Sequence, residues 1–243
     1  MKKRVSILNV PVHDVSLAET AAAAREAVLN GKRLRVVTAN PEIICRAASE
    51  TGLRAAVAGA DLVTADGVGV LWAARRLGQP LRERVTGIDL VQALFQLGGG
   101  MGWRVFLLGG RPGVAAEAAE RQGELYPGLI FAYAHGYFTP EEEEALTERI
   151  RAFRPQVLLA GLGAPRQEIW LDAHMDLAAV SIGVGGAFDV LAGRKKRAPL
   201  WIQRAGCEWL YRLIREPGRF RRQWVLPLFV WRVMREYYGR GTT

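Results

Sequence analysis

The sequence predicts an α/β protein with two parts: a Rossmann-like, mostly parallel, doubly wound sheet over residues 1–193, and a basic helical appendage over residues 194–243. Apolar runs typical of strands alternate with helical patterns through the first part, as in βαβ units. Several runs are nearly unbroken, as in Trp103 to Leu108, which is typical of parallel strands buried on both faces. The strand patterns stop after Gly193, so the boundary is compositional.

Composition narrows the class of protein. With 243 residues and 50% hydrophobic content, the chain can bury a large core. Cys45 and Cys207 lie far apart, and the three histidines lack the spacing of metal ligands, so neither a disulfide framework nor a zinc site is predicted. A reduced, cytoplasmic setting is therefore expected. No run of about 18 apolar residues and no secretory signal pattern is present, so we expect no membrane span.

The first elements follow from cap and turn residues. Residues 5–10 predict a strand, and Ser16 begins a helix that ends near Asn30. A strand over residues 34–38 then leads into a helix from residue 42. This places Thr38 and Asn40 at the end of a strand, although Asn before Pro is also a common turn.

The third strand ends in an acidic residue. Residues 63–65 lead into Asp66, Gly67 and Gly69, and an Ala-rich helical pattern follows. Ligands of open α/β sheets bind where strands lead into helices, so the Asp66 carboxylate could face a substrate. Asp is also a common helix N-cap, and this segment alone leaves both interpretations open.

Residues 81–90 lead into a helix that continues through Leu97, with Arg84 and Asp89 as its unusual polar members. Each taken alone fits a surface ion pair. The strand over residues 103–108 then ends in Gly109 and Gly110, before a helix over residues 114–125. These glycines would let a backbone approach phosphate, although the loop is not a GxGxxG fingerprint.

The second half repeats the scheme. Strands are predicted over residues 129–133, 157–160 and 180–184, with a helix from Thr139 to Phe153 between the first two. The last two strands end in glycine-rich loops, which carry Gly163, Gln167, Glu168, Gly185 and Asp189. Tight turns explain each glycine singly, but several such strand ends in a row predict a small-molecule site.

The last fifty residues differ in charge. Residues 1–193 carry 20 basic and 21 acidic residues, whereas residues 194–243 carry 13 and 3, together with four of the seven tryptophans. Helices are predicted over residues 199–215 and 217–238. Cationic, aromatic-rich helices bind anionic membrane surfaces; contact with nucleic acid, or a helical lid, would also fit this composition.

Short motifs stand in order along the chain, at residues 40–42 (NPE), 65–69 (ADGVG), 83–89 (ERVTGID), 135–138 (HGYF), 161–168 (GLGAPRQE), 183–189 (GVGGAFD), 197–199 (RAP), 208–213 (EWLYRL) and 216–219 (EPGR). Together, over nearly the whole chain, these motifs resemble those of the WecG/TagA/CpsF glycosyltransferases.

The resemblance implies inverting transfer of a sugar from a UDP donor to a polyprenyl-diphosphate-linked sugar. In the TagA branch the donor is UDP-N-acetylmannosamine and the acceptor is undecaprenyl-diphosphate-GlcNAc, giving the linkage unit of wall teichoic acid. The enzyme would then be cytoplasmic and attached peripherally to the inner face of the bacterial membrane. The family lacks a DxD metal motif, as does this sequence, so no metal and no cofactor are expected.

The chemistry of such a transfer assigns the candidate residues. Asp66 is the expected catalytic base for the acceptor hydroxyl. Cationic side chains would meet the diphosphate charge, and sugar groups would be oriented by Thr38, Asn40, Gln167 and Glu168. The expected diphosphate ligands are Arg84, Arg212, Arg219 and Arg222. The expected nucleotide-binding loops contain Gly109, Gly110, Gly163, Gly185 and Asp189.

The sequence leaves alternatives open for the donor sugar, for the function and for the oligomeric state. Relatives use UDP-N-acetylmannosaminuronic acid or UDP-glucose, and Arg166 could pair with a donor carboxylate. The alternative that is not an enzyme is a nucleotide- or RNA-binding module. The basic appendage, residues 194–243, which we call the tail, lacks an RNA-binding signature, so no nucleic acid partner is expected. We call residues 1–193 the body. A homo-oligomer is compatible with the sequence, which does not fix the oligomeric state.

Overall fold

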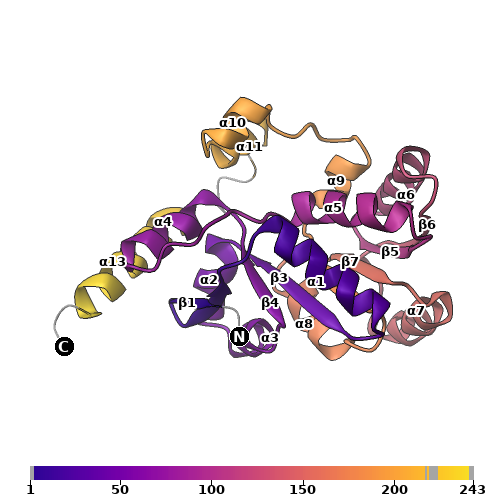
Figure 1. The fold of residues 1–243 in the computed structure, drawn as a ribbon, viewed down its shortest axis with the longest axis horizontal. Coiled ribbons are helices and arrows are strands. Elements are labelled where there is room, and N and C mark those ends of the chain that lie inside the picture. The colour runs from indigo at the N-terminus through magenta and orange to yellow at the C-terminus, as the bar shows by residue number, and fades with distance from the viewer. Residues whose placement is uncertain (1–2, 217, 219–223, 241–243) are drawn as a thin grey trace.

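A computed structural model describes residues 3–216, 218 and 224–240, and its centre is one parallel sheet (Figure 1). All neighbouring strands of this sheet run parallel, which confirms the predicted fold class. Across the sheet the order is β4 (Leu62–Ala65), β3 (Leu34–Ala39), β8 (Val180–Gly183), β7 (Val157–Gly161), β5 (Arg104–Gly109) and β6 (Ile130–Ala134).

Helices cover both faces of the sheet. Alternate residues of each inner strand face opposite layers of helices. In β5, for example, Val105 and Leu107 pack against one layer, whereas Phe106 and Leu108 pack against the other. The first layer contains α1 (Leu17–Leu29), α5 (Gly87–Gly99), α6 (Val114–Leu125) and α9 (Ala187–Leu191). The second contains α2 (Pro41–Ala47), α3 (Thr51–Ala58), α7 (Pro140–Phe153) and α8 (Arg166–Ala173).

Helix starts follow the predicted caps. Ser16 and Thr139 each form a capping box, in which the hydroxyl accepts the backbone N–H of a glutamate three residues later and that glutamate accepts the N–H of the cap. These reciprocal bonds satisfy N–H groups that lack partners within the helix.

The N-terminal strand prediction is wrong in its extent. Residues 4–13 form a hairpin of β1 (Arg4–Ile7) and β2 (Val10–His13) that lies outside the main sheet. Leu8 and Asn9 turn the chain with φ of 50° and 66°, the conformation of a two-residue hairpin turn. His13 accepts the backbone N–H of Val63 through Nδ1 at 2.9 Å, so the hairpin covers the edge strand β4.

The first tail helix is also shorter than predicted. Residues 199–215 form two helices, α10 (Leu200–Arg204) and α11 (Glu208–Arg215), because Gly206 takes a φ of 74° between them. In Figure 1 this pair lies at the top of the view, outside the layers of helices that cover the sheet.

The last helix, α13 (Val225–Arg240), lies along the body instead. It packs on α2 and on α4 (Val68–Arg76), where Phe229 and Val233 are fully buried. Part of the predicted 217–238 helix lies outside the described residues. The division at residue 193 stays a prediction.

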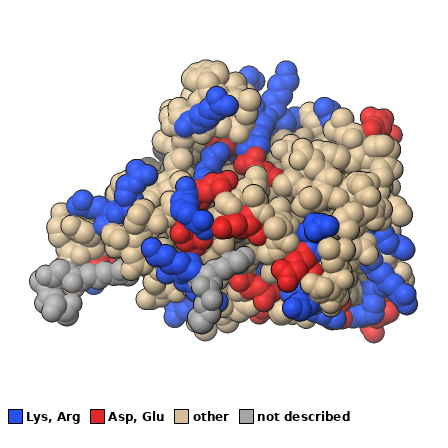
Figure 2. Space-filling model, in the orientation of Figure 1, with Lys and Arg blue, Asp and Glu red and all other residues tan. Residues whose placement is uncertain are grey.

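The tail presents large apolar side chains to solvent. Leu200, Trp201 and Ile214 are each about 70% exposed, and Trp231 is 57% exposed. On the face seen in Figure 2, Lys and Arg side chains lie beside the uncharged surface of the α10–α11 region at the top of the view. Among the described residues, no helix combines the length and hydropathy needed to cross a bilayer.

Candidate active site

A cleft of about 930 Å³ opens at the carboxyl ends of β3, β4 and β8. Asn40 follows β3, Asp66 follows β4 and Val184 follows β8, and all three line it. The helices after β3 and β8 cover opposite faces of the sheet, so the cleft lies at a topological switch point, the usual ligand site of such sheets. The tail contributes the remaining wall, from α11 and from the start of α13.

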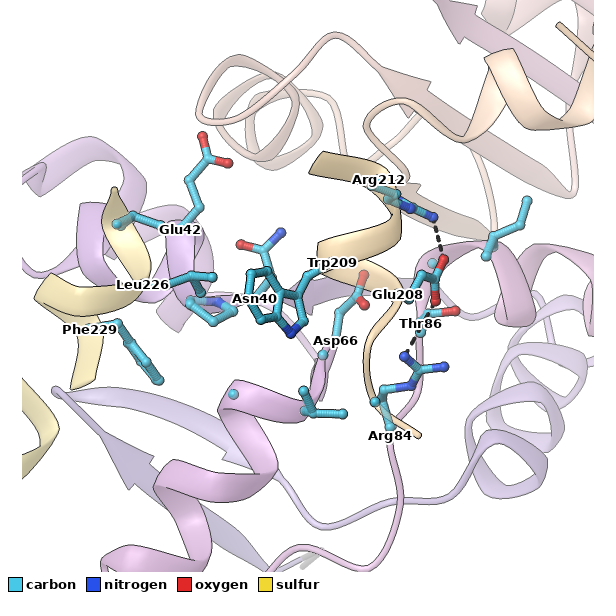
Figure 3. A pocket seen from close by; sticks show the side chains of 18 of the residues that line it. Asn40, Glu42, Asp66, Arg84, Thr86, Glu208, Trp209, Arg212, Leu226 and Phe229 are labelled. Atoms are coloured by element: carbon cyan, nitrogen blue, oxygen red, sulfur yellow. Dashed lines mark hydrogen bonds and ion pairs between the residues drawn. The ribbon is translucent and has the colours of Figure 1, made fainter. Parts of the chain in front are cut away.

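Asp66 points into this cleft (Figure 3). The N-cap of α4 is Gly67, with no side-chain capping bond, so the capping interpretation of Asp66 does not hold. The backbone N–H of Gly87, the first residue of α5, instead favours the ionised form of the Asp66 carboxylate. Burial raises the pKa of Asp66 to about 6, although the positive charges of Arg212 and Arg84 act in the opposite direction.

Two predicted diphosphate ligands meet beside Asp66. Arg212 Nη2 donates to Glu208 Oε1 at 2.7 Å, and Arg84 Nη1 donates to Glu208 Oε2 at 3.4 Å. Figure 3 shows these side chains on one side of Asp66, with Leu226 and Phe229 on the other. Arg84 comes from the body and Arg212 from α11, so the structure brings together residues that are far apart in the sequence.

A second ion pair continues this cluster. Arg197 Nη1 donates to Asp89 Oδ1 at 2.5 Å, and the Thr86 hydroxyl donates to Asp89 Oδ2 at 2.6 Å. Burial alone would raise the pKa of Asp89, but these bonds hold it below its usual value. Arg84 and Asp89 therefore form ion pairs, as expected for each taken alone. Their partners, Glu208 and Arg197, belong to the tail, and the pairs lie beside the cleft and not on open surface.

The opposite wall of the cleft is apolar. Trp72 on α4 and Val225, Leu226 and Phe229 on α13 supply most of it. One cavity therefore joins a charged end, which suits phosphate and sugar groups, to a hydrocarbon-like wall.

Thr38 and Asn40, predicted to orient sugar groups, lie in different surroundings at the end of β3. Asn40 lines the cleft, yet its Oδ1 accepts the N–H of Ile43 at 3.0 Å and caps α2, as the turn interpretation predicts. Thr38 is buried, and its hydroxyl donates to the Gly183 carbonyl at 3.2 Å. It lies beneath Gly87, whose added Cβ would contact the Thr38 hydroxyl.

Gln167 and Glu168 are buried away from the cleft lining. Gln167 Oε1 accepts the N–H groups of Gly163, at 3.2 Å, and Gly185, at 3.1 Å, while its Nε2 donates to Glu168 Oε1. One amide thus holds the loops after β7 and β8 together. Burial raises the pKa of Glu168.

The remaining predicted loops lie side by side because β5, β7 and β8 are neighbours. A Cβ on Gly109 would come within 2.5 Å of the Gly161 backbone, so close packing of adjacent strands requires glycine there. Asp189 pairs with Lys195 at 3.0 Å. Nucleotide binding by these loops stays a prediction, and Arg219 and Arg222 lie outside the described residues.

The sequence interpretation did not select Glu208, Arg197 or Thr86 as site residues. A signal existed for Glu208, since it is one of three acidic residues in a strongly basic tail. Within the described ranges, no group of three or more His, Cys, Asp and Glu side chains is arranged to hold a metal ion. Metal independence stays a prediction.

Comparisons with known proteins agree with these motifs. The sequence model described as "Glycosyl transferase WecG/TagA/CpsF family" matches residues 5–242. Relatives from Staphylococcus aureus strains MW2, NCTC 8325 / PS 47 and MRSA252 are each 33% identical over 234 residues, which is 95% of this chain and 92% of each relative. Each is named N-acetylglucosaminyldiphosphoundecaprenol N-acetyl-beta-D-mannosaminyltransferase. The chain is therefore a glycosyltransferase that belongs to the WecG/TagA/CpsF family.

Proposed function

We propose that this enzyme transfers N-acetylmannosamine from UDP-N-acetylmannosamine to undecaprenyl-diphosphate-linked N-acetylglucosamine, the step that builds the linkage unit of wall teichoic acid. The names of the Staphylococcus relatives support the transferred sugar and the acceptor. The observation that carries the proposal is Asp66, a carboxylate with a raised pKa in a cleft that has a charged end and an apolar wall.

The reaction is a single displacement with inversion. The acceptor hydroxyl oxygen attacks the anomeric carbon of the donor and gives its proton to the Asp66 carboxylate. The bond from that carbon to the diphosphate oxygen breaks, and its electron pair leaves with UDP. Arg84 and Arg212 lie where they could stabilise this charge, because guanidinium groups bind phosphate oxygens in a bidentate manner.

A lipid-linked acceptor suits the other wall. The apolar side chains of α4 and α13 could contact the first part of a polyprenyl chain while its diphosphate remains near the arginines. The exposed Trp201 and Ile214, together with the basic residues of the tail, support peripheral attachment at the cytoplasmic face of an anionic membrane.

A transfer assay with purified protein and a short-chain lipid-diphosphate-GlcNAc acceptor tests the proposal. The donors are UDP-N-acetylmannosamine, UDP-N-acetylmannosaminuronic acid and UDP-glucose, each with and without EDTA. We expect product from the first donor alone, unchanged by EDTA. Product from another donor would overturn the assigned sugar, and loss of product in EDTA would overturn metal independence.

A preparation that forms no product with any donor, but retains RNA at physiological salt, would favour the non-enzymatic binding module instead.

A further inference from the structure

Glu208 has an unusual position for an acidic residue of a basic tail. It is the first residue of α11 and is only 7% exposed. Its carboxylate contacts three guanidinium groups: Arg212 at 2.7 Å, Arg84 at 3.4 Å and Arg197 at 3.8 Å. Both carboxylate oxygens are engaged, Oε1 by Arg212 and Arg197 and Oε2 by Arg84.

These contacts join separate parts of the chain. Arg84 precedes α5 in the body, 124 residues before Glu208, whereas Arg212 is one turn further along α11. A buried carboxylate is costly unless it is paired, so Glu208 favours the arrangement in which α11 lies against Arg84. The same carboxylate thus fixes one arginine on each side of the border between body and tail.

Both of these arginines act on Asp66. Arg84, Glu208 and Arg212 line the same cleft as Asp66. Each arginine lowers the pKa of the Asp66 carboxyl, and Glu208 raises it. Without Glu208, the two guanidinium groups, which now contact the same carboxylate, would repel each other. Their present positions therefore depend on the negative charge between them.

We propose that Glu208 is a positioning residue: its carboxylate holds Arg84 of the body and Arg212 of the tail beside Asp66, so that the docking of α11 on the body and the assembly of the diphosphate-binding end depend on the same ion pairs. The expected effect of Glu208 on transfer kinetics rests on the proposed function. Its expected effect on the attachment of α11 rests on the ion pairs alone.

A double-mutant cycle tests the kinetic consequence. Glu208→Gln should lower kcat/KM by roughly 30-fold or more, as expected when one partner of a buried charge pair is neutralised. In an Arg212→Gln background the same substitution should cost much less, because Glu208 acts through that arginine. Glu208→Asp keeps the charge and should retain more activity than Glu208→Gln. Additive losses in the double variant, or full activity of Glu208→Gln, would overturn the proposal.

Hydrogen exchange of the full-length protein supplies a readout that needs no substrate. Glu208→Gln should speed exchange in residues 208–215 and leave β5 unchanged, since α11 loses its attachment to Arg84. The matched control is Glu148→Gln, the same change at an exposed ion pair with Arg151 on α7. Unchanged exchange in α11 would overturn the inference even if transfer is observed, whereas a wild-type enzyme inactive with every donor would overturn the proposed function and leave this test decisive.

Discussion

Asp66 combines the two properties that a general base requires. It lies in a cleft large enough for substrate, and burial raises its pKa to about 6 while nearby arginines keep it from rising further. A carboxylate with this pKa is ionised at pH 7 and is more basic than an ordinary aspartate, so it accepts a proton more readily.

The pH dependence of transfer should report this residue directly. Protonation of Asp66 removes the base, so kcat/KM should fall as the pH drops through about 6, near the pKa of Asp66. Asp66→Asn should lower transfer about 10²–10⁴-fold and remove that limb. The measurement is a kcat/KM profile from pH 5 to 8, with UDP binding by calorimetry as the control. A variant that keeps both the rate and the limb would rule out Asp66 as the base.

Prediction from the sequence succeeded where the signal was local. The strand, the two glycines and the helix start around Asp66 lie within fourteen residues, and the structure reproduces that order. The partners of Arg84 and Asp89 could not be predicted in this way, because they lie 124 and 108 residues away in the tail. Ion pairs of that separation depend on how the whole chain folds.

Secondary-structure elements were also predictable where the signal is local and not where it depends on distant contacts. Ser16 and Thr139 begin helices as their cap chemistry predicts. The pattern over residues 5–10 predicts one strand where the structure has a hairpin, because the turn of that hairpin, Leu8 and Asn9, contains no Gly or Pro. That turn is fixed from far away: the backbone N–H of Leu8 donates to Glu236 of α13 at 2.9 Å.

The contribution of α13 to the core can be measured by substitution of Phe229, which is 1% exposed. Phe229→Ala should lower the free energy of unfolding by about 3–5 kcal/mol, because it leaves a cavity against α2 and α4. Leu228 on the same helix is 40% exposed and provides the control. Leu228→Ala should cost less than about 1 kcal/mol. Equal costs in denaturant unfolding would show that α13 does not pack as described.

Considered as a whole, the molecule has an uneven surface. Its basic excess lies in residues 194–243, which also expose Trp201 and Ile214, while the body is close to neutral. Such a surface should bind anionic bilayers through both charge and apolar contact, so binding should weaken as salt is added.

Flotation with phosphatidylglycerol-containing vesicles tests this asymmetry. The full chain should float with the vesicles at low salt, and the double variant Trp201→Ala with Ile214→Ala should float several-fold less. Leu125→Ala is the control, because Leu125 is 62% exposed on α6 of the body. Equal flotation of the double variant and the control would place the membrane contact elsewhere.

The packing of α13 also sets the order in which the enzyme can mature. Arg232 Nη1 donates to the Cys45 carbonyl, 187 residues earlier, and Phe229 and Val233 complete the core around α2 and α4. During synthesis at about 5–20 residues per second, the residues around Cys45 therefore wait roughly ten to forty seconds for the helix that completes their packing. Those residues expose apolar surface on the ribosome meanwhile, so chaperone demand should be greatest there, and the cleft is completed only once α13 has been made.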